Sequence, residues 1–167
     1  MSLNHLLSWL ADTSFSNTIR GSVWAEPVIE TVHVLTLTMF FGFVVMLDLR
    51  LLGRFLVNRP MSQVLLHLNR YLIASYVVMV VSGVLLFCGD PVSFWTTFPF
   101  KAKMVMLVLA GLNTLAFNAT VGKRTAIWDL DPVTPAGAKI AAVVSMVLWV
   151  SIIAAGRAIA YVLPPPI

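Results

Sequence analysis

The sequence has few charged residues. Asp, Glu, Lys and Arg make up 11% of its 167 positions, whereas about 25% is usual in a water-soluble domain. Hydrophobic residues account for 59%, and they gather into long blocks that a soluble core does not require. The basic residues lie at the ends of these blocks and not on one polar surface. The net charge of +4 therefore indicates contact with lipid head groups, and we expect no nucleic acid as a partner.

Cysteine and catalytic motifs are equally scarce. The single cysteine, Cys88, excludes an internal disulfide framework and a four-thiolate metal site. The sequence contains no Walker A loop, no nucleophile elbow and no cysteine pair. Residues 1–10 lack the basic region and the small-residue cleavage site of a signal peptide. We therefore expect the first spanning helix to direct insertion.

Four apolar stretches are long enough to span a bilayer, which takes about 20 helical residues. Gly and Pro punctuate the connections between them, and short connections favour antiparallel neighbours. The sequence thus predicts an all-α, integral membrane antiparallel four-helix bundle over residues 28–162. Its helices are predicted at residues 28–52, 68–88, 101–121 and 139–162, and residues 163–167 form a tail.

Residues 1–27 form a separate element. Leu3, Leu6, Leu7 and Leu10 recur at helical spacing, with Trp9 among them. An amphipathic piece this short is expected to lie in the membrane interface and not to span the bilayer. We predict an N-terminal interfacial amphipathic helix.

The basic residues are unevenly shared between the two ends of the predicted bundle. Those in or beside the first and third connections are Arg50, Arg54, Arg59, Arg70, Lys123, Arg124 and Lys139. Those at the other end are Arg20, Lys101, Lys103 and Arg157. The positive-inside rule then places both termini outside the cytoplasm.

Ionisable residues at membrane depth are candidates for function, because a charge at the centre of a spanning helix costs about 2.5–3.5 kcal/mol. Glu30 and His33 are three positions apart near the start of the first helix, so they share a face. Antiparallel packing is expected to bring further polar and sulfur-containing residues to their level, just beneath the outer lipid boundary. These are Lys101, Lys103, Met104, Met106, Arg157 and Tyr161.

A second polar set lies at the inner boundary. We interpret Arg50 and Arg54 as residues that reach lipid phosphates and fix topology, with Asp48 as their local counter-ion. Between the two levels, Asn113 is expected to hydrogen-bond a neighbouring helix, and Trp149 is expected to pack. Small residues allow close helix contact; they include Gly42, Ser75, Ser82, Gly83, Gly111 and Ser145.

One hypothesis makes His33 an axial ligand to haem b, since four-helix bundles hold cofactors between facing helices. His67 cannot be the second ligand, because at 1.5 Å per residue it lies roughly 20 Å or more away. Arg157, Lys101 and Lys103 are then suited to pair with the haem propionates. A sixth ligand would come from Met104, Met106 or a lysine.

Other hypotheses remain open. Glu30 and His33 form one Glu-x-x-His half-motif, but di-iron bundles need two copies and further glutamates. Copper bound by His33 with Met104 or Met106 is chemically allowed. Glu30, His33 and Arg157 could instead act in transport, as a proton or solute relay. The same residues could also form a polar network that only fixes helix packing.

Several short strings together resemble an uncharacterised family of small bacterial four-helix membrane proteins. They are W-A-E-P-V-I-E-T-V-H-V-L (24–35), D-L-R-L-L-G (48–53), S-G-V-L-L-F (82–87), F-P-F-K-A-K-M (98–104), A-G-L-N (110–113) and A-G-R-A-I-A-Y (155–161). The resemblance implies the fold and a bacterial inner membrane, but no established activity. The motif residues it carries over are Glu30, His33, Asp48, Arg50, Lys103, Asn113 and Arg157.

Taken together, these features predict a haem- or metal-associated membrane subunit, with His33 as ligand and a role in electron transfer. We expect it to contact the lipid bilayer and to assemble as a homo-oligomer or with other membrane subunits. The alternative is a transport or structural subunit.

Overall fold

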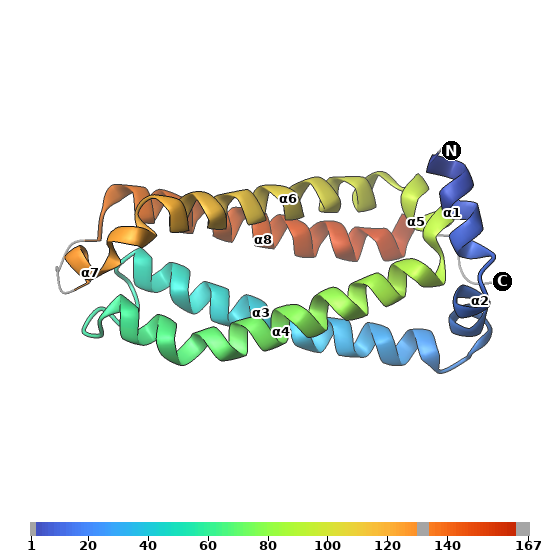
Figure 1. Ribbon diagram of the computed structural model, residues 1–167, viewed down its shortest axis with the longest axis horizontal. Coiled ribbons are helices and arrows are strands. Elements are labelled where there is room, and N and C mark those ends of the chain that lie inside the picture. The colour runs from blue at the N-terminus through green and yellow to red at the C-terminus, as the bar shows by residue number, and fades with distance from the viewer. Residues whose placement is uncertain (1–2, 130–133, 163–167) are drawn as a thin grey trace.

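The computed structural model describes residues 3–129 and 134–162, and this part of the chain is helical with short connections. Four helices are long and apolar enough to cross a bilayer (Figure 1). They are α3 (Ala25–Leu51), α4 (Met61–Gly89), α6 (Phe98–Ala119) and α8 (Ala136–Val162). The chain is therefore a multi-pass membrane protein with an all-α bundle.

Every predicted span is a helix, but each helix starts earlier than predicted. The start of α4 moves from residue 68 to Met61, because the helix continues through Gln63 and His67 beyond its apolar stretch. The start of α6 moves from residue 101 to Phe98. Pro99 lies in its first turn, where a missing backbone N–H costs nothing and the fixed φ angle suits a helix. Polar residues and proline thus belong to the helix ends and not only to the connections.

The long helices form two pairs. Helix α3 packs along α4, helix α6 packs along α8, and the pairs meet chiefly between α3 and α8. Figure 1 shows the α6/α8 pair lying over the α3/α4 pair. The short helix α5 (Pro91–Thr96) lies at one end, hereafter the α5 end. The 3₁₀ turn η1 (Gly122–Arg124) and α7 (Thr125–Trp128) lie at the other, hereafter the α7 end.

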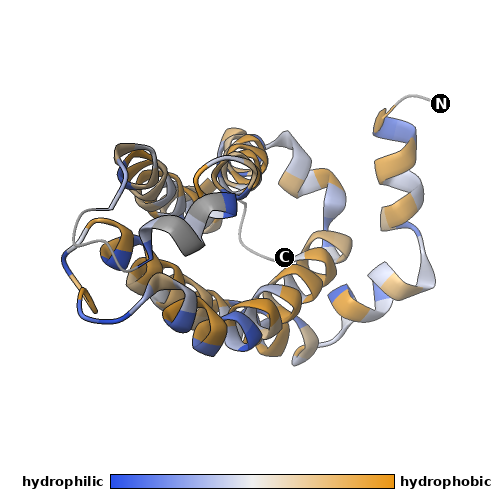
Figure 2. Ribbon diagram, turned by 60° about the vertical axis from the view of Figure 1, so that its left-hand side comes forward, coloured by the Kyte–Doolittle hydropathy of each residue, from blue (hydrophilic) through white to orange (hydrophobic). Residues whose placement is uncertain are grey.

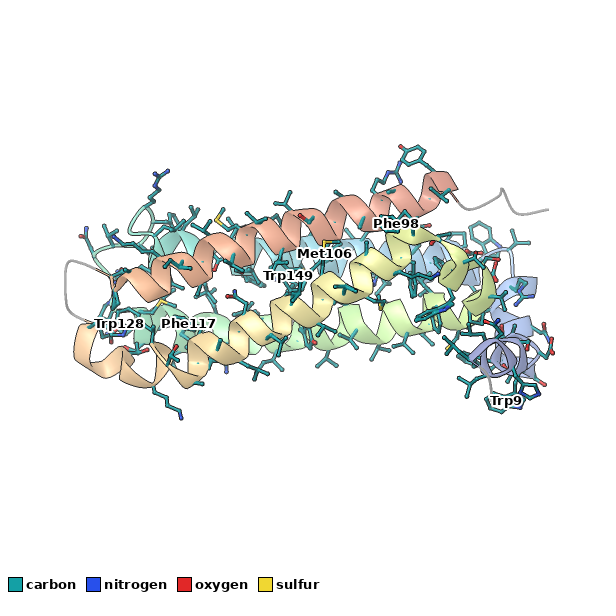
Figure 3. The ribbon with its side chains drawn as sticks, turned by 90° about the horizontal axis from the view of Figure 1, so that it is seen from above. Trp9, Phe98, Met106, Phe117, Trp128 and Trp149 are labelled. Carbon is teal, nitrogen blue, oxygen red and sulfur yellow. The ribbon has the colours of Figure 1, made fainter. Side chains whose placement is uncertain are left out.

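A central apolar cluster joins all four long helices halfway along the bundle. Phe40 of α3 meets Trp149 of α8 edge-on, with ring centroids 4.8 Å apart and planes at 66°. Met79 of α4 and Ala110 of α6 complete the cluster with Ile152, and Figure 3 shows Trp149 in this central region. The predicted packing role of Trp149 is confirmed. This cluster divides the interior into two polar regions.

The contact between α6 and α8 includes the predicted hydrogen bond of Asn113. Its Nδ2 donates to the carbonyl oxygen of Ala141 at 3.0 Å, as expected for a polar side chain that links spanning helices. Outside such contacts the long helices present apolar side chains outward, and Figure 2 shows hydrophobic residues along most of their length. These surfaces contact the lipid bilayer.

The N-terminal segment consists of two short helices at the α5 end, α1 (Leu3–Ala11) and α2 (Ser14–Gly21). The Ser16 hydroxyl donates to the Cys88 carbonyl at 2.7 Å, and the Arg20 guanidinium donates to the Gly89 carbonyl at 3.1 Å. These bonds satisfy carbonyl groups left free at the end of α4. Helix α1 leaves Leu6 and Trp9 exposed, as the predicted interfacial role requires.

At the α7 end, Asp129 caps the start of α4. Its carboxylate accepts hydrogen bonds from the Ser62 backbone N–H, at 2.9 Å, and from the Ser62 hydroxyl. Burial acts to raise the pKa of Asp129, but the hydrogen bonds from Ser62 outweigh it, so this pKa lies below its ordinary value. The connection that follows α6 is thereby attached to the first turn of α4.

We expect Asp129→Ala to lower stability at neutral pH by roughly 0.5–2 kcal/mol, the usual cost of losing a helix cap. A depressed pKa means that the carboxylate stabilises the fold above the ordinary Asp value, about 3.9. The contribution is lost as pH falls through the lower folded value. Thermal unfolding in detergent should therefore separate wild type from variant at neutral pH but not in strong acid. Asp12→Ala is the control, because the Asp12 carboxylate makes no hydrogen bond with other described residues; an equal loss there would contradict the capping role.

Candidate ligand site between the helix pairs

His33 lies on α3 with its ring against α4. Its Nδ1 is 3.0 Å from the Met79 carbonyl oxygen and 3.0 Å from the Ser82 hydroxyl. A carbonyl oxygen only accepts hydrogen bonds, so Nδ1 carries the proton in this arrangement. The Ser82 hydroxyl in turn donates to the Val78 carbonyl at 2.8 Å. In a neutral imidazole this arrangement fixes one tautomer, with the lone pair on Nε2.

Gly83 makes this contact between α3 and α4 possible. A Cβ atom added at Gly83 would lie 3.1 Å from Cε1 of His33, tighter than nine in ten real Cβ contacts, so the ring would have to shift by a few tenths of an ångström. The imidazole therefore occupies the space that a side chain at position 83 would fill. The Ser82 hydroxyl hydrogen-bonds the imidazole ring. Gly83 has no side chain and so leaves space for the ring.

Lys103 approaches the same level from α6. Its side chain lies over Gly156 of α8, where an added Cβ would be 3.5 Å from Nζ. Lys103 is the charged group that acts electrostatically on His33. Two contacts therefore lie toward the α5 end: His33 of α3 with Ser82 and Gly83 of α4, and Lys103 of α6 with Gly156 of α8.

Three other predicted site residues are not part of this group. Glu30 is exposed and lines a shallow groove on α3 with Thr31, Val34 and Leu35. Lys101 is also exposed. Arg157 is exposed, and its guanidinium lies 5.2 Å from the centre of the Tyr161 ring and donates to the Tyr161 hydroxyl at 3.4 Å.

Helical rotation explains the separation of Lys101 and Arg157 from this group. Each residue advances about 100° around a helix. Lys101 is two positions from Lys103, so it lies on nearly the opposite face of α6. Arg157 follows the inward-facing Gly156 by one position, and that rotation directs it toward Tyr161 and away from the interior.

The methionines of α6 occupy different surroundings. Met106 packs against the central apolar cluster, which lies deeper than Lys103, and Figure 3 shows it near Trp149. Met104 is half-buried. Above this level, Phe87 of α4 and Phe100 of α6 stack with centroids 5.3 Å apart and planes at 7°. This aromatic contact closes the space between α4 and α6 at the α5 end.

Few side chains near His33 could act as metal ligands. Among the described residues, no three His, Cys, Asp or Glu side chains gather in a way that could hold a metal ion. His33 is therefore the one strong nitrogen ligand available at this level, with the Lys103 ammonium as its charged neighbour.

At the α7 end the predicted pairing of Asp48 with Arg50 is not found. Asp48 is 6% exposed and Arg50 is 5% exposed, yet neither forms an ion pair within the described part of the chain. The Arg50 Nε donates to the Arg59 carbonyl at 2.9 Å. Two positions along a helix turn a side chain by about 200°, so these residues face opposite directions. Arg50 therefore holds the connection after α3 in place and does not reach toward lipid.

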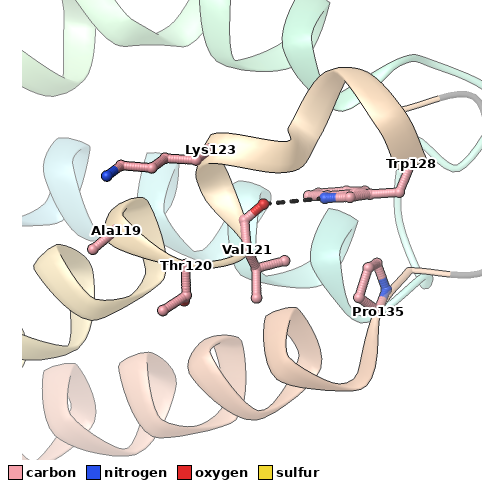
Figure 4. A pocket seen from close by; sticks show the side chains of 6 residues that line it. All are labelled: Ala119, Thr120, Val121, Lys123, Trp128 and Pro135. Carbon is pink, nitrogen blue, oxygen red and sulfur yellow. Dashed lines mark hydrogen bonds between the residues drawn. The ribbon is translucent and has the colours of Figure 1, made fainter.

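A groove also opens at the α7 end. Its wall includes the Trp128 indole, whose Nε1 donates to the Val121 carbonyl at 3.2 Å (Figure 4). Lys123 is exposed at its edge. The lining residues are Ala119, Thr120, Val121, Lys123, Trp128 and Pro135. This groove is far from His33, at the opposite end of the bundle.

A model of a protein family described as a family of unknown function (DUF6644) matches residues 7–162. The chain belongs to this family. The match covers most of the chain and confirms the predicted resemblance to an uncharacterised family. The His33 and Asp48 regions of this DUF6644 protein both lie within the matched range. No curated protein and no solved structure matches the chain.

Proposed function

We propose that this protein is an integral membrane subunit that binds haem b between its two helix pairs, with His33 Nε2 as an axial ligand to the iron. The observation that carries the proposal is the hydrogen bond from Nδ1 to the Met79 carbonyl. Histidine ligands usually donate their other ring N–H to a carbonyl or carboxylate, which fixes the ring and its tautomer. His33 has this arrangement.

Haem suits the donor set better than a bare metal ion does. The porphyrin itself supplies four nitrogen ligands, so the protein needs to provide only one or two. A metal without a macrocycle would need several protein ligands, and the described residues offer no such group at His33. Lys103 provides an ammonium group that can pair with a propionate. A bound haem would supply one-electron transfer.

A transport relay has weaker support. The relay predicted from the sequence needs Glu30, His33 and Arg157 close together, but Glu30 and Arg157 are exposed and His33 is not. A purely structural role accounts for the hydrogen bonds of His33 at Nδ1 but assigns no role to Nε2. The haem proposal uses both nitrogens of the ring.

We further propose a bacterial inner membrane as the location, with the α7 end in the cytoplasm. The first and third connections lie at that end and carry the larger share of basic residues. The ligand site then lies near the outer face. The long apolar surfaces of the spans are also suited to a homo-oligomer or to other membrane subunits.

The absorption spectrum of the protein, purified in detergent after expression with added haem, tests the function. We expect a Soret band that is present in the wild type and absent in His33→Ala. His67→Ala is the matched control, because His67 also has Nδ1 near a backbone carbonyl, that of Gln63 at 2.7 Å, but it is exposed near the other end of the bundle. A colourless wild type, or a band that survives in His33→Ala, would overturn the haem assignment.

A further inference from the structure

We propose that Asp48 is a proton-binding site inside the bundle near the α7 end. The side chain is more than nine-tenths buried, and its Oδ2 atom makes no hydrogen bond with any other residue that the structure describes. An isolated ionised carboxylate in such surroundings is strongly disfavoured, and the group takes up a counter-charge instead. The smallest counter-charge is a proton on the unpartnered oxygen.

Among the residues that the structure describes, no basic side chain forms an ion pair with Asp48. The Ser145 side chain of α8 lies against the carboxyl group. Arg50, the nearest basic residue in the sequence, turns to the Arg59 carbonyl and acts on Asp129. Apolar side chains also pack around the end of α3 and include Leu47 and Leu51. Asp48 is therefore not neutralised by a side chain of the described part of the chain.

A proton fits this site better than a metal cation does. Hard cations take about six or more oxygen ligands, whereas Asp48 belongs to no group of His, Cys, Asp or Glu side chains that could hold a metal ion among the described residues. The Asn113 amide of α6 is engaged with the Ala141 carbonyl of α8. A proton needs a single oxygen, and Oδ2 provides it.

The position of Asp48 fixes the side from which the proton arrives. Asp48 is three residues from the end of α3 at Leu51, which is about 4.5 Å along the helix axis. It is fifteen positions, or about 22 Å, from His33, and the central apolar cluster lies between them. The proton is exchanged with water at the α7 end, so the site is independent of any haem at His33.

Infrared difference spectroscopy and carbodiimide labelling test this proposal on the full-length protein in lipid vesicles. We expect the wild type at neutral pH to show the carbonyl stretch of a protonated carboxylic acid, and Asp48→Asn to lose it. Dicyclohexylcarbodiimide is an apolar reagent for protonated carboxyl groups. The acid O–H adds across one C=N bond to give an O-acylisourea, which rearranges to a stable N-acylurea without a leaving group. Peptide mapping should find the label on Asp48.

Glu30 is the internal control, because it is an exposed carboxyl group on the same helix. Label on Asp48 with Glu30 unmodified supports the proposal. Label on Glu30 alone, or a carboxylate signal from Asp48 at neutral pH, overturns it. Labelling that is suppressed by Na⁺ but not by choline at constant pH would show a metal-cation site and also overturn it. If Asp48→Asn does not fold, labelling and mapping of the wild type alone decide.

Discussion

Trp149→Ala should be the most destabilising single substitution in the spanning helices, lowering the free energy of unfolding by about 3 kcal/mol. Loss of a large aromatic side chain from a water-soluble core costs about 3–5 kcal/mol. In a bilayer the unfolded helices already face apolar lipid, so the transfer contribution largely disappears and the packing contribution remains. Trp149 is 8% exposed and contacts Phe40 where the two helix pairs meet. The cavity would open at that junction.

Unfolding by a denaturing detergent in mixed micelles, followed by helix content, measures this loss. Trp24→Ala is the matched control, because Trp24 is 77% exposed just before α3. We expect the control to stay within about 0.5 kcal/mol of the wild type, as is usual for surface substitutions. Equal losses in the two variants would show that the central cluster does not hold the pairs together.

Gly83→Val should abolish ligand binding at His33 while the bundle remains folded. Its Cβ alone would come within 3.1 Å of the imidazole, and the two methyl groups of valine need still more of the same space. The ring must then leave its hydrogen bonds with Met79 and Ser82. We expect the loss of the Soret band proposed above, as complete as in His33→Ala.

Gly111→Val provides the control for a valine placed within a spanning helix. A Cβ at Gly111 meets no atom within 4 Å among the described residues, so we expect an unchanged spectrum. Helix content and elution volume show whether both variants fold. If Gly83→Val folds and keeps the full Soret band, ligand binding does not depend on the observed position of His33.

The fold could be predicted from the sequence because the bilayer imposes a simple requirement. A spanning segment must satisfy its backbone hydrogen bonds internally and present apolar side chains, so long apolar blocks identify helices directly. The helix boundaries could be predicted from the sequence less precisely than the number of spans. The α4 helix extends through polar residues to Met61 because backbone hydrogen bonding continues where the apolar composition stops.

The site was only partly predictable for a different reason. Position along the chain gives the depth of a residue, and this is why the sequence predicts His33 and Lys103 at one level. The rotation of each helix about its axis comes from packing, and this rotation separates Lys101 and Arg157 from the interior. It also separates Asp48 from Arg50. Ser82 and Gly83 were assigned to helix contact alone, because sequence spacing does not show that a histidine of another helix uses both.

The arrangement in pairs has a consequence for how the chain is assembled. Helices α3 and α4 are consecutive spans and are also neighbours in space, so they form a helical hairpin whose contacts need no later part of the chain. Helices α6 and α8 form a second hairpin in the same way. Domains with local contacts fold quickly and in order of synthesis. The junction of Phe40 with Trp149 must wait for the last span, and the surroundings of His33 are therefore completed only when the second hairpin docks against the first.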